Sequence, residues 1–260
     1  MPNPTNNSLG GESPLLVWLD SFTGNWVRHW SLVAWAPLRP TGANSVQKQQ
    51  RNRDIFILSM LFVSTIAFIV SIDLNRSNYI LQMFATLGIY RAFDLSITVI
   101  RTGVFLNFRG DVALKEEPSW RVRRVLVGVL VNYLELIMWF AVIYYYLALV
   151  CGNQFNFSIS EAHQALYLSM STMTTVGYGG YAPNTLISTS VTLWQSLLAI
   201  LMVASVIGNI IAVLSNPSSA RTVPFIPNER NWKSWVVPIL IGTPMLAFIY
   251  IFLNNAKDCS

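Results

Sequence analysis

Two glycines at alternate positions mark the stretch Thr175–Gly179, which reads Thr-Val-Gly-Tyr-Gly. Because glycine enters the left-handed region of backbone conformation without steric cost, Gly177 and Gly179 can alternate in handedness with Val176 and Tyr178. That alternation turns successive carbonyl groups toward one axis, and the threonine at the start adds a hydroxyl. Backbone oxygens arranged in this way can replace the water around a dehydrated cation. The chemistry predicted for this stretch is therefore cation coordination by the main chain.

Such a loop needs helices to hold it, because non-helical backbone at membrane depth is tolerated only where protein buries it or where it lines a water-filled cavity. The chain is 53% hydrophobic and 11% charged, whereas soluble domains are about a quarter charged. A helical span takes about 20 apolar residues. Five stretches qualify: Ile55–Ile72, Asn78–Ile100, Val125–Val150, Thr185–Leu214 and Trp235–Leu253. A sixth, Ser158–Thr174, is too short and polar to span and predicts a short helix that leads into the loop.

The basic residues predict the orientation of these spans. Most of the 17 lysines and arginines fall before the first span, between the second and third, and between the fourth and fifth. Because basic residues accumulate in short cytoplasmic loops, we expect a cytoplasmic N-terminus, five spans and an outer C-terminus. Met1–Gly11 lacks the charge and apolar core of a secretory signal, so the first span is expected to stay in the protein. The net charge of +5 is scattered between apolar spans, which disfavours nucleic-acid binding.

A family resemblance emerges when the loop is taken with its neighbours. Thr172–Gly179, the short helix before it and the flanking spans Val125–Val150 and Thr185–Leu214 together resemble the pore domain of the potassium channel family, over Arg123–Leu214. The resemblance implies K+ as the transported ion and no resident cofactor. The ion ligands that it implies are Thr175, Val176, Gly177 and Tyr178. Since the family's pore takes four loops and this chain offers one, it also implies a C4 homotetramer.

The expected fold is an all-α membrane protein with five transmembrane helices, a re-entrant pore helix and a filter loop. The expected parts are a cytoplasmic tail with an interfacial helix (1–54), two peripheral spans (55–100), a cytoplasmic linker (101–124), the pore domain (125–214), a cytoplasmic loop (215–234), and the fifth span with an outer C-terminus (235–260). Compactness favours a bacterial inner membrane. Two alternatives remain open, a weakly selective cation channel and a non-conducting membrane subunit or sensor. No arrangement of residues supports an enzyme.

The loop departs from the family pattern at its outer end. Most relatives carry an aspartate where this chain has Gly180, and a carboxylate on the pore helix where it has Ser171. These two residues and Thr174 are the candidate filter supports. Without the carboxylates, we expect a filter that inactivates easily or admits other cations.

The inner span differs as well. Relatives often carry a hinge glycine where this chain has Ala199, and the glycine of this span is Gly208. Gating by bending is therefore expected near Gly208 and Asn209. Close helix packing at a small residue is an equal alternative.

Three ionisable residues inside the spans need partners. At about 1.5 Å per residue, Arg91 lies roughly 14 Å and Glu135 roughly 16 Å from the same membrane face. An ion pair is therefore expected, with Asp94 one turn from Arg91 as a competitor. A structural clamp is favoured over a gating element. Arg91 and Arg101 are far apart with Asp94 between them, so a ladder of gating charges is absent and weak voltage dependence at most is expected. Basic residues of the linker are either topology signals or contacts to anionic lipid heads.

The short helix before the loop carries capping candidates at its start. Ser158 or Ser160 is expected to be the N-cap, with Glu161 in the first turn, where a carboxylate complements the helix dipole. His163 is expected to lie on the outer surface rather than to sense pH.

The N-terminal segment has an aromatic periodicity. Aromatic residues recur every four positions, at Trp18, Phe22, Trp26 and Trp30. This pattern predicts either an interfacial amphipathic helix or a stripe packed on a neighbouring helix. Cys151 and Cys259 fit neither a zinc pattern nor a disulfide framework and are expected to be incidental.

Overall fold

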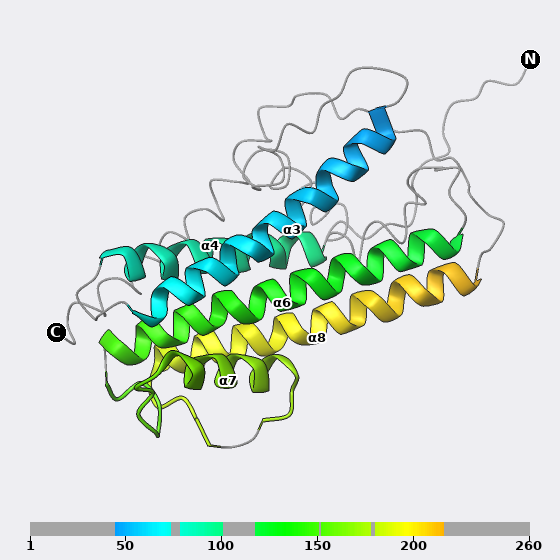
Figure 1. The fold of residues 1–260 in the computed structure, drawn as a ribbon. Coiled ribbons are helices and arrows are strands. Elements are labelled where there is room, and N and C mark those ends of the chain that lie inside the picture. The colour runs from blue at the N-terminus through cyan, green and yellow to red at the C-terminus, as the bar shows by residue number, and fades with distance from the viewer. Residues whose placement is uncertain (1–44, 74–78, 101–117, 151, 178–179, 216–260) are drawn as a thin grey trace, which may run out of the picture.

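The computed structural model of the chain describes residues 45–73, 79–100, 118–150, 152–177 and 180–215. Within these residues every regular element is a helix, and the one extended contact is an isolated bridge between Phe155 and Pro183. The helices are α3 (Ser45–Ile72), α4 (Tyr79–Ile100), α6 (Pro118–Val150), α7 (Ala162–Met173) and α8 (Leu186–Ser215). The described part of the chain is thus all-α (Figure 1).

Four of these helices are long and apolar enough to cross a membrane. The qualifying segments are Asp54–Ile72, Tyr79–Ile100, Leu126–Val150 and Leu186–Gly208. They occupy four of the five stretches predicted as spans, and their many exposed apolar side chains suit contact with lipid. The fifth predicted span lies outside the described residues, as do the aromatic N-terminal segment, both cysteines and the 215–234 loop beyond Ser215. The length and composition are those of an integral membrane protein.

Three helix boundaries differ from the sequence expectation, the first being that of α3, which begins at Ser45 within the predicted tail and not at Ile55. The helix α6 begins at Pro118, so the end of the predicted cytoplasmic linker is already helical. Proline suits a first helical position because its missing N–H would have no intrahelical partner there. The expected serine cap of the short helix is wrong, because α7 begins at Ala162 with Glu161 as the N-cap. The Gln164 side chain accepts hydrogen bonds from the backbone N–H of Ser160 (2.9 Å) and Glu161 (3.3 Å), which satisfies two donors at this end.

The longest helix, α6, is the centre of the arrangement. It packs against α3, α4, α7 and α8, and α8 lies beside it with the opposite chain direction (Figure 1). Its second half is almost fully buried, with large side chains such as Trp139, Phe140 and Tyr144 at 0–1% exposure. These aromatic residues fill the space between the peripheral pair α3 and α4 on one side and α7 and α8 on the other.

The segments before α7 and after the Thr-Val-Gly-Tyr-Gly stretch are tied to one another. Asn156 donates its backbone N–H to the Ala182 carbonyl (2.9 Å), and its side chain accepts from the Ala182 N–H (2.6 Å). The carbonyl of Gln154 accepts from the Asn184 N–H (2.8 Å) and from the Ser188 hydroxyl on α8 (2.7 Å). Both ends of the loop region are therefore fixed beside the start of α8.

Candidate functional site

The helix α7 descends along α6 toward the middle of the membrane span. Ser169 donates its hydroxyl to the Ile137 carbonyl (2.8 Å), and four residues further on the Met173 carbonyl accepts from the Tyr133 hydroxyl (2.5 Å). Moving four residues forward on α7 thus corresponds to moving four residues back on α6. At 1.5 Å per residue, Tyr133 lies about 25 Å from the Val150 end of α6. The C-terminal end of α7, the negative end of its dipole, therefore lies deep within the span.

The backbone after α7 alternates in handedness. Thr175 has φ +58° and Gly177 has φ +57°, whereas Val176 between them is not in the left-handed region. A positive φ is uncommon for a β-branched residue such as threonine. The amides are turned back toward α7: Thr175 donates to the Thr172 carbonyl (3.1 Å), and Val176 and Gly177 donate to the Ser171 carbonyl (3.1 and 3.4 Å).

This arrangement of amides determines what the carbonyl groups can do. Among the described residues, no donor contacts the carbonyl oxygens of Thr175, Val176 or Gly177. Three successive oxygens are therefore available as ligands, while the matching N–H groups are occupied. The remaining two members of the stretch, Tyr178 and Gly179, lie outside the described residues.

The three predicted support residues act differently from one another. Thr174 turns its hydroxyl back to the Met170 carbonyl (2.8 Å), within its own helix end. Ser171 likewise donates its hydroxyl to the Leu168 carbonyl (3.0 Å), so it supports the stretch through its own carbonyl and not through its side chain. Gly180 is half-buried and offers no side chain.

An aromatic cluster that the sequence analysis missed lies just after Gly180. The Tyr181 ring makes edge contacts with Phe157 and with Tyr167 of α7, each at 6.3 Å between ring centroids. Edge-to-face contacts of this kind stabilise by about 0.5–1.5 kcal/mol each. Three aromatic residues therefore hold the chain that follows the Thr-Val-Gly-Tyr-Gly stretch. The one sequence signal for this cluster was an aromatic residue, Tyr181, directly after Gly180.

The predicted gating residues all lie within α8. Ala199 is buried at 1% exposure, and α8 is assigned as one continuous helix through it and through Gly208 and Asn209. Glu161 and His163, at the start of α7, are both exposed, with 3.0 Å between a Glu161 oxygen and His163 Nδ1.

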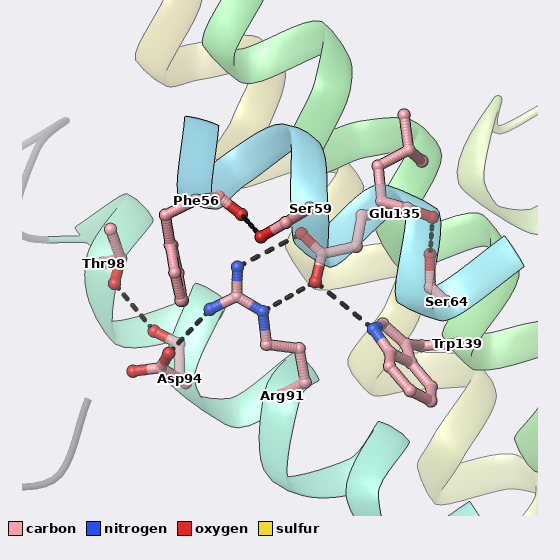
Figure 2. Close-up of polar contacts among 9 residues, drawn as sticks. Phe56, Ser59, Ser64, Arg91, Asp94, Thr98, Glu135 and Trp139 are labelled. Atoms are coloured by element: carbon pink, nitrogen blue, oxygen red, sulfur yellow. Dashed lines mark hydrogen bonds and ion pairs between the residues drawn. The ribbon is translucent and has the colours of Figure 1, made fainter. Parts of the chain in front are cut away.

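Arg91, Asp94 and Glu135 meet in a buried cluster between α3, α4 and α6 (Figure 2). Arg91 donates from Nε and a terminal nitrogen to the two Glu135 oxygens (2.6 and 3.1 Å), and from the other terminal nitrogen to Asp94 Oδ2 (2.8 Å). The indole N–H of Trp139 donates to Glu135 Oε1 (3.3 Å), and the guanidinium lies 5.6 Å from the Phe56 ring centroid. All three charged residues are at most 2% exposed.

The cluster has more negative than positive groups. One guanidinium faces two carboxylates, and Asp94 Oδ1 is buried without a hydrogen-bond partner among the described residues. A buried ion pair holds elements in register more than it stabilises the fold, since desolvation offsets much of the attraction. The geometry is that of a clamp joining the two peripheral helices to α6, at the level where Tyr133 supports the end of α7.

A second buried polar group was also missed from the sequence. Gln195 of α8 donates from Nε2 to the carbonyl and the hydroxyl of Ser169 on α7, both at 2.9 Å. Its Oε1 accepts from the Tyr144 hydroxyl of α6 (2.6 Å). All three residues are at 0% exposure. A lone glutamine in an apolar span signals a partner on another helix, but not which one.

Residues 132–216 match the model of a protein family described as ion channels. The matched segment runs from α6 through α7 and the loop to the end of α8, so it includes the loop, Glu135 and Gln195 but not Arg91 or Asp94 of α4. Searches of curated proteins and of solved structures gave no match. The match and the four apolar helices support an ion channel as the class of protein, which indicates transport rather than enzymatic chemistry.

Proposed function

We propose that this protein is a potassium-selective channel that conducts K+ passively through a filter formed by Thr175–Gly179. The observation that carries the proposal is the pair of positive φ angles at Thr175 and Gly177, with the intervening amides bonded to Ser171. This backbone leaves the carbonyl oxygens free to take the place of water around an ion. The negative end of α7 lies at the same depth and lowers the free energy of a cation there.

The complete pore is a C4 homotetramer, because one loop surrounds an axis on one side only. Exposed apolar residues support an assembly. Val176 is 51% exposed in the single chain, and α8 carries a stripe with Leu193 (59%), Leu197 (51%) and Ile200 (58%). Side chains next to a conduction pathway need neighbours that exclude lipid, and three further copies supply them.

K+ is the transported ion in this proposal, and the protein needs no resident cofactor. The N-terminus is cytoplasmic, and the membrane is a bacterial inner membrane whose anionic lipid heads contact the basic linker. Residues 125–214 form the pore domain, and the peripheral helices are joined to it by the Arg91 clamp.

A weakly selective cation channel is the second candidate, and two observations favour it. Gly180 contributes no carboxylate, and the Ser171 hydroxyl is bonded to its own helix. The outer end of the filter then depends on the ring contacts of Tyr181. Ring contacts hold the loop backbone in place less firmly than a hydrogen bond to a charged group does. The loop could then widen or narrow and admit ions of other sizes.

The test is ion flux from lipid vesicles containing the purified tetramer. We expect K+ efflux in the wild type, with a reversal potential in mixed K+ and Na+ close to that of K+. Gly177→Ala should abolish flux because a side chain is strained at φ +57°. Gly152→Ala is the matched control, since nothing lies within 4 Å of a Cβ there. A reversal potential midway between the two ions would favour the weakly selective channel. A wild-type tetramer without flux would refute conduction altogether and favour a non-conducting subunit.

A further inference from the structure

The hydrogen bonds around Gln195 form a set that links three helices, and the Tyr144 hydroxyl also lies 3.4 Å from the Thr192 hydroxyl of α8. Both hydrogens of the Gln195 amide go to Ser169, and its oxygen accepts from Tyr144. Ser169 in turn donates its hydroxyl to the Ile137 carbonyl. Each polar group of the set therefore has a partner, and the set runs from α6 through α8 to α7 and back to α6.

Stability alone does not explain why these three fully buried side chains are polar. Replacement of fully buried polar groups by apolar groups of the same shape is often neutral, so the burial of three polar side chains in a membrane domain contributes little to stability. What directional hydrogen bonds add is a fixed position, because they are satisfied at one rotation and one depth of each helix. Here that fixed position is the one of α7 relative to α8.

Ser169 lies one turn before the end of α7. Met173, at that end, is held from the α6 side by the Tyr133 hydroxyl. Gln195 holds the preceding turn from the α8 side. The stretch with alternating handedness follows directly, with its amides bonded to Ser171 between these two points. The orientation of the filter amides is therefore set by a turn of helix that is fixed from both neighbouring helices.

We propose that Gln195 is a positioning residue for the filter: it fixes the depth and rotation of α7 against α8 and thereby the geometry of the Thr175–Gly177 carbonyl groups. The inference deepens the proposed function and rests on it for its transport readout. It assigns a selectivity role to a side chain that contacts no ion.

The neighbouring residue provides a matched control at the same depth. The Trp194 indole donates to the Ser96 hydroxyl of α4 (3.3 Å), and its ring makes edge contacts with Phe93 and Phe140. Trp194 thus joins α8 to α4 and α6. Trp194→Phe removes a polar contact one position away from Gln195 and is expected to leave the filter unchanged.

The first measurement is hydrogen exchange of the Val176 and Gly177 amides in the tetramer, followed by mass spectrometry. Gln195→Met keeps the length of the side chain and removes its hydrogen bonds. Exchange at the two amides should become about ten-fold faster, the size expected from the loss of one buried hydrogen bond. In vesicles, the K+ to Na+ permeability ratio should fall about ten-fold as well. Trp194→Phe should match the wild type in both assays.

A triple variant separates positioning from folding. Tyr144→Phe, Ser169→Ala and Gln195→Met together leave no side chain of the set unpaired, so the tetramer should melt near the wild-type temperature. Its amide exchange and permeability ratio should nevertheless resemble those of Gln195→Met. If Gln195→Met alone does not assemble, the triple variant decides the question.

Wild-type exchange and selectivity in an assembled triple variant would overturn the positioning role. The exchange assay needs no conduction, so it also distinguishes two kinds of failure. A wild-type protein without flux refutes the proposed function, whereas unchanged exchange in the assembled variants refutes the role of Gln195.

Discussion

The unequal charges of the Arg91 cluster predict an order of damage among three single substitutions. Arg91 faces Glu135 through two hydrogen bonds (2.6 and 3.1 Å) and Asp94 through one (2.8 Å). Counted at their formal charges, the three residues sum to one net negative charge. Each substitution changes both this sum and the number of groups left without a partner.

Arg91→Met removes the single cation and leaves two buried carboxylates uncompensated, which costs about 3–5 kcal/mol. Glu135→Gln removes the charge of the carboxylate that makes two hydrogen bonds to Arg91, but it leaves Asp94 as the counter-ion. The free energy of unfolding should therefore fall by about 1.5–3 kcal/mol, the value of a hydrogen bond to a charged group. Asp94→Asn removes one contact, but it leaves a neutral, two-bonded Arg91–Glu135 pair and discharges the unpartnered Oδ1. We therefore expect a change below about 1 kcal/mol for Asp94→Asn.

The assay is denaturant unfolding of the purified protein in mixed micelles, with the free energy of unfolding compared at equal detergent composition. The expected order of destabilisation is Arg91→Met, then Glu135→Gln, then Asp94→Asn. Ser59→Ala on α3 is a suitable control, because its hydroxyl is bonded to the Phe56 carbonyl of its own helix and not to the cluster.

Equal damage from Asp94→Asn and Arg91→Met would contradict the charge reasoning, because the two substitutions change the net charge in opposite directions. A direct exchange of charges, Arg91→Glu with Glu135→Arg, is a poorer test. Asp94 would then lie beside a second carboxylate on its own helix, so incomplete rescue is expected even if the pairing is real.

Four further substitutions test the helix contacts and the loop. Gly88→Ala should destabilise the protein by about 1–3 kcal/mol, because a Cβ there would lie 3.1 Å from the Trp139 ring. Gly128→Ala, with nothing within 4 Å, should be neutral or slightly stabilising in the same denaturant unfolding assay. Tyr133→Phe leaves the last carbonyl of α7 without its 2.5 Å partner and should cost about 1 kcal/mol, measured in the same way. Gly180→Asp adds a carboxylate after the last glycine of the proposed filter and should prolong the steady-state current in planar bilayers; an unchanged current would count against a role for this position.

The membrane spans and the depths of residues within them could be predicted from the sequence, because each depends on a property summed over many residues. The four described spans follow from apolar runs long enough to outweigh local exceptions. The depths of Arg91 and Glu135 follow from counting helical rise from one membrane face, and in the structure these side chains lie 2.6 Å apart. The fixed rise of a helix makes such a count reliable even without knowing which faces meet.

Features that depend on a single turn or on helix rotation could not be predicted. Serine, threonine and acidic residues all serve as N-caps, so Ser158, Ser160 and Glu161 compete, and the position of Gln164 decides between them. The partner of Gln195 depends on the rotation of α8 about its axis, and apolar spans give little signal of rotation. The contact between Tyr181 and α7 depends on the path of an irregular loop, for which the sequence has no periodicity.

The tie between Gln154–Asn156 and Ala182–Thr185 closes the loop region at its two ends. Its entry and exit segments are hydrogen-bonded to each other, so the two ends of the intervening chain are held together. The entropic cost of closing the loop is offset by the hydrogen bonds between the residues at its two ends. Because α7 within this segment is also held by Tyr133 of α6 and Gln195 of α8, a chimera that transplants residues 154–185 has to carry those two partners with it.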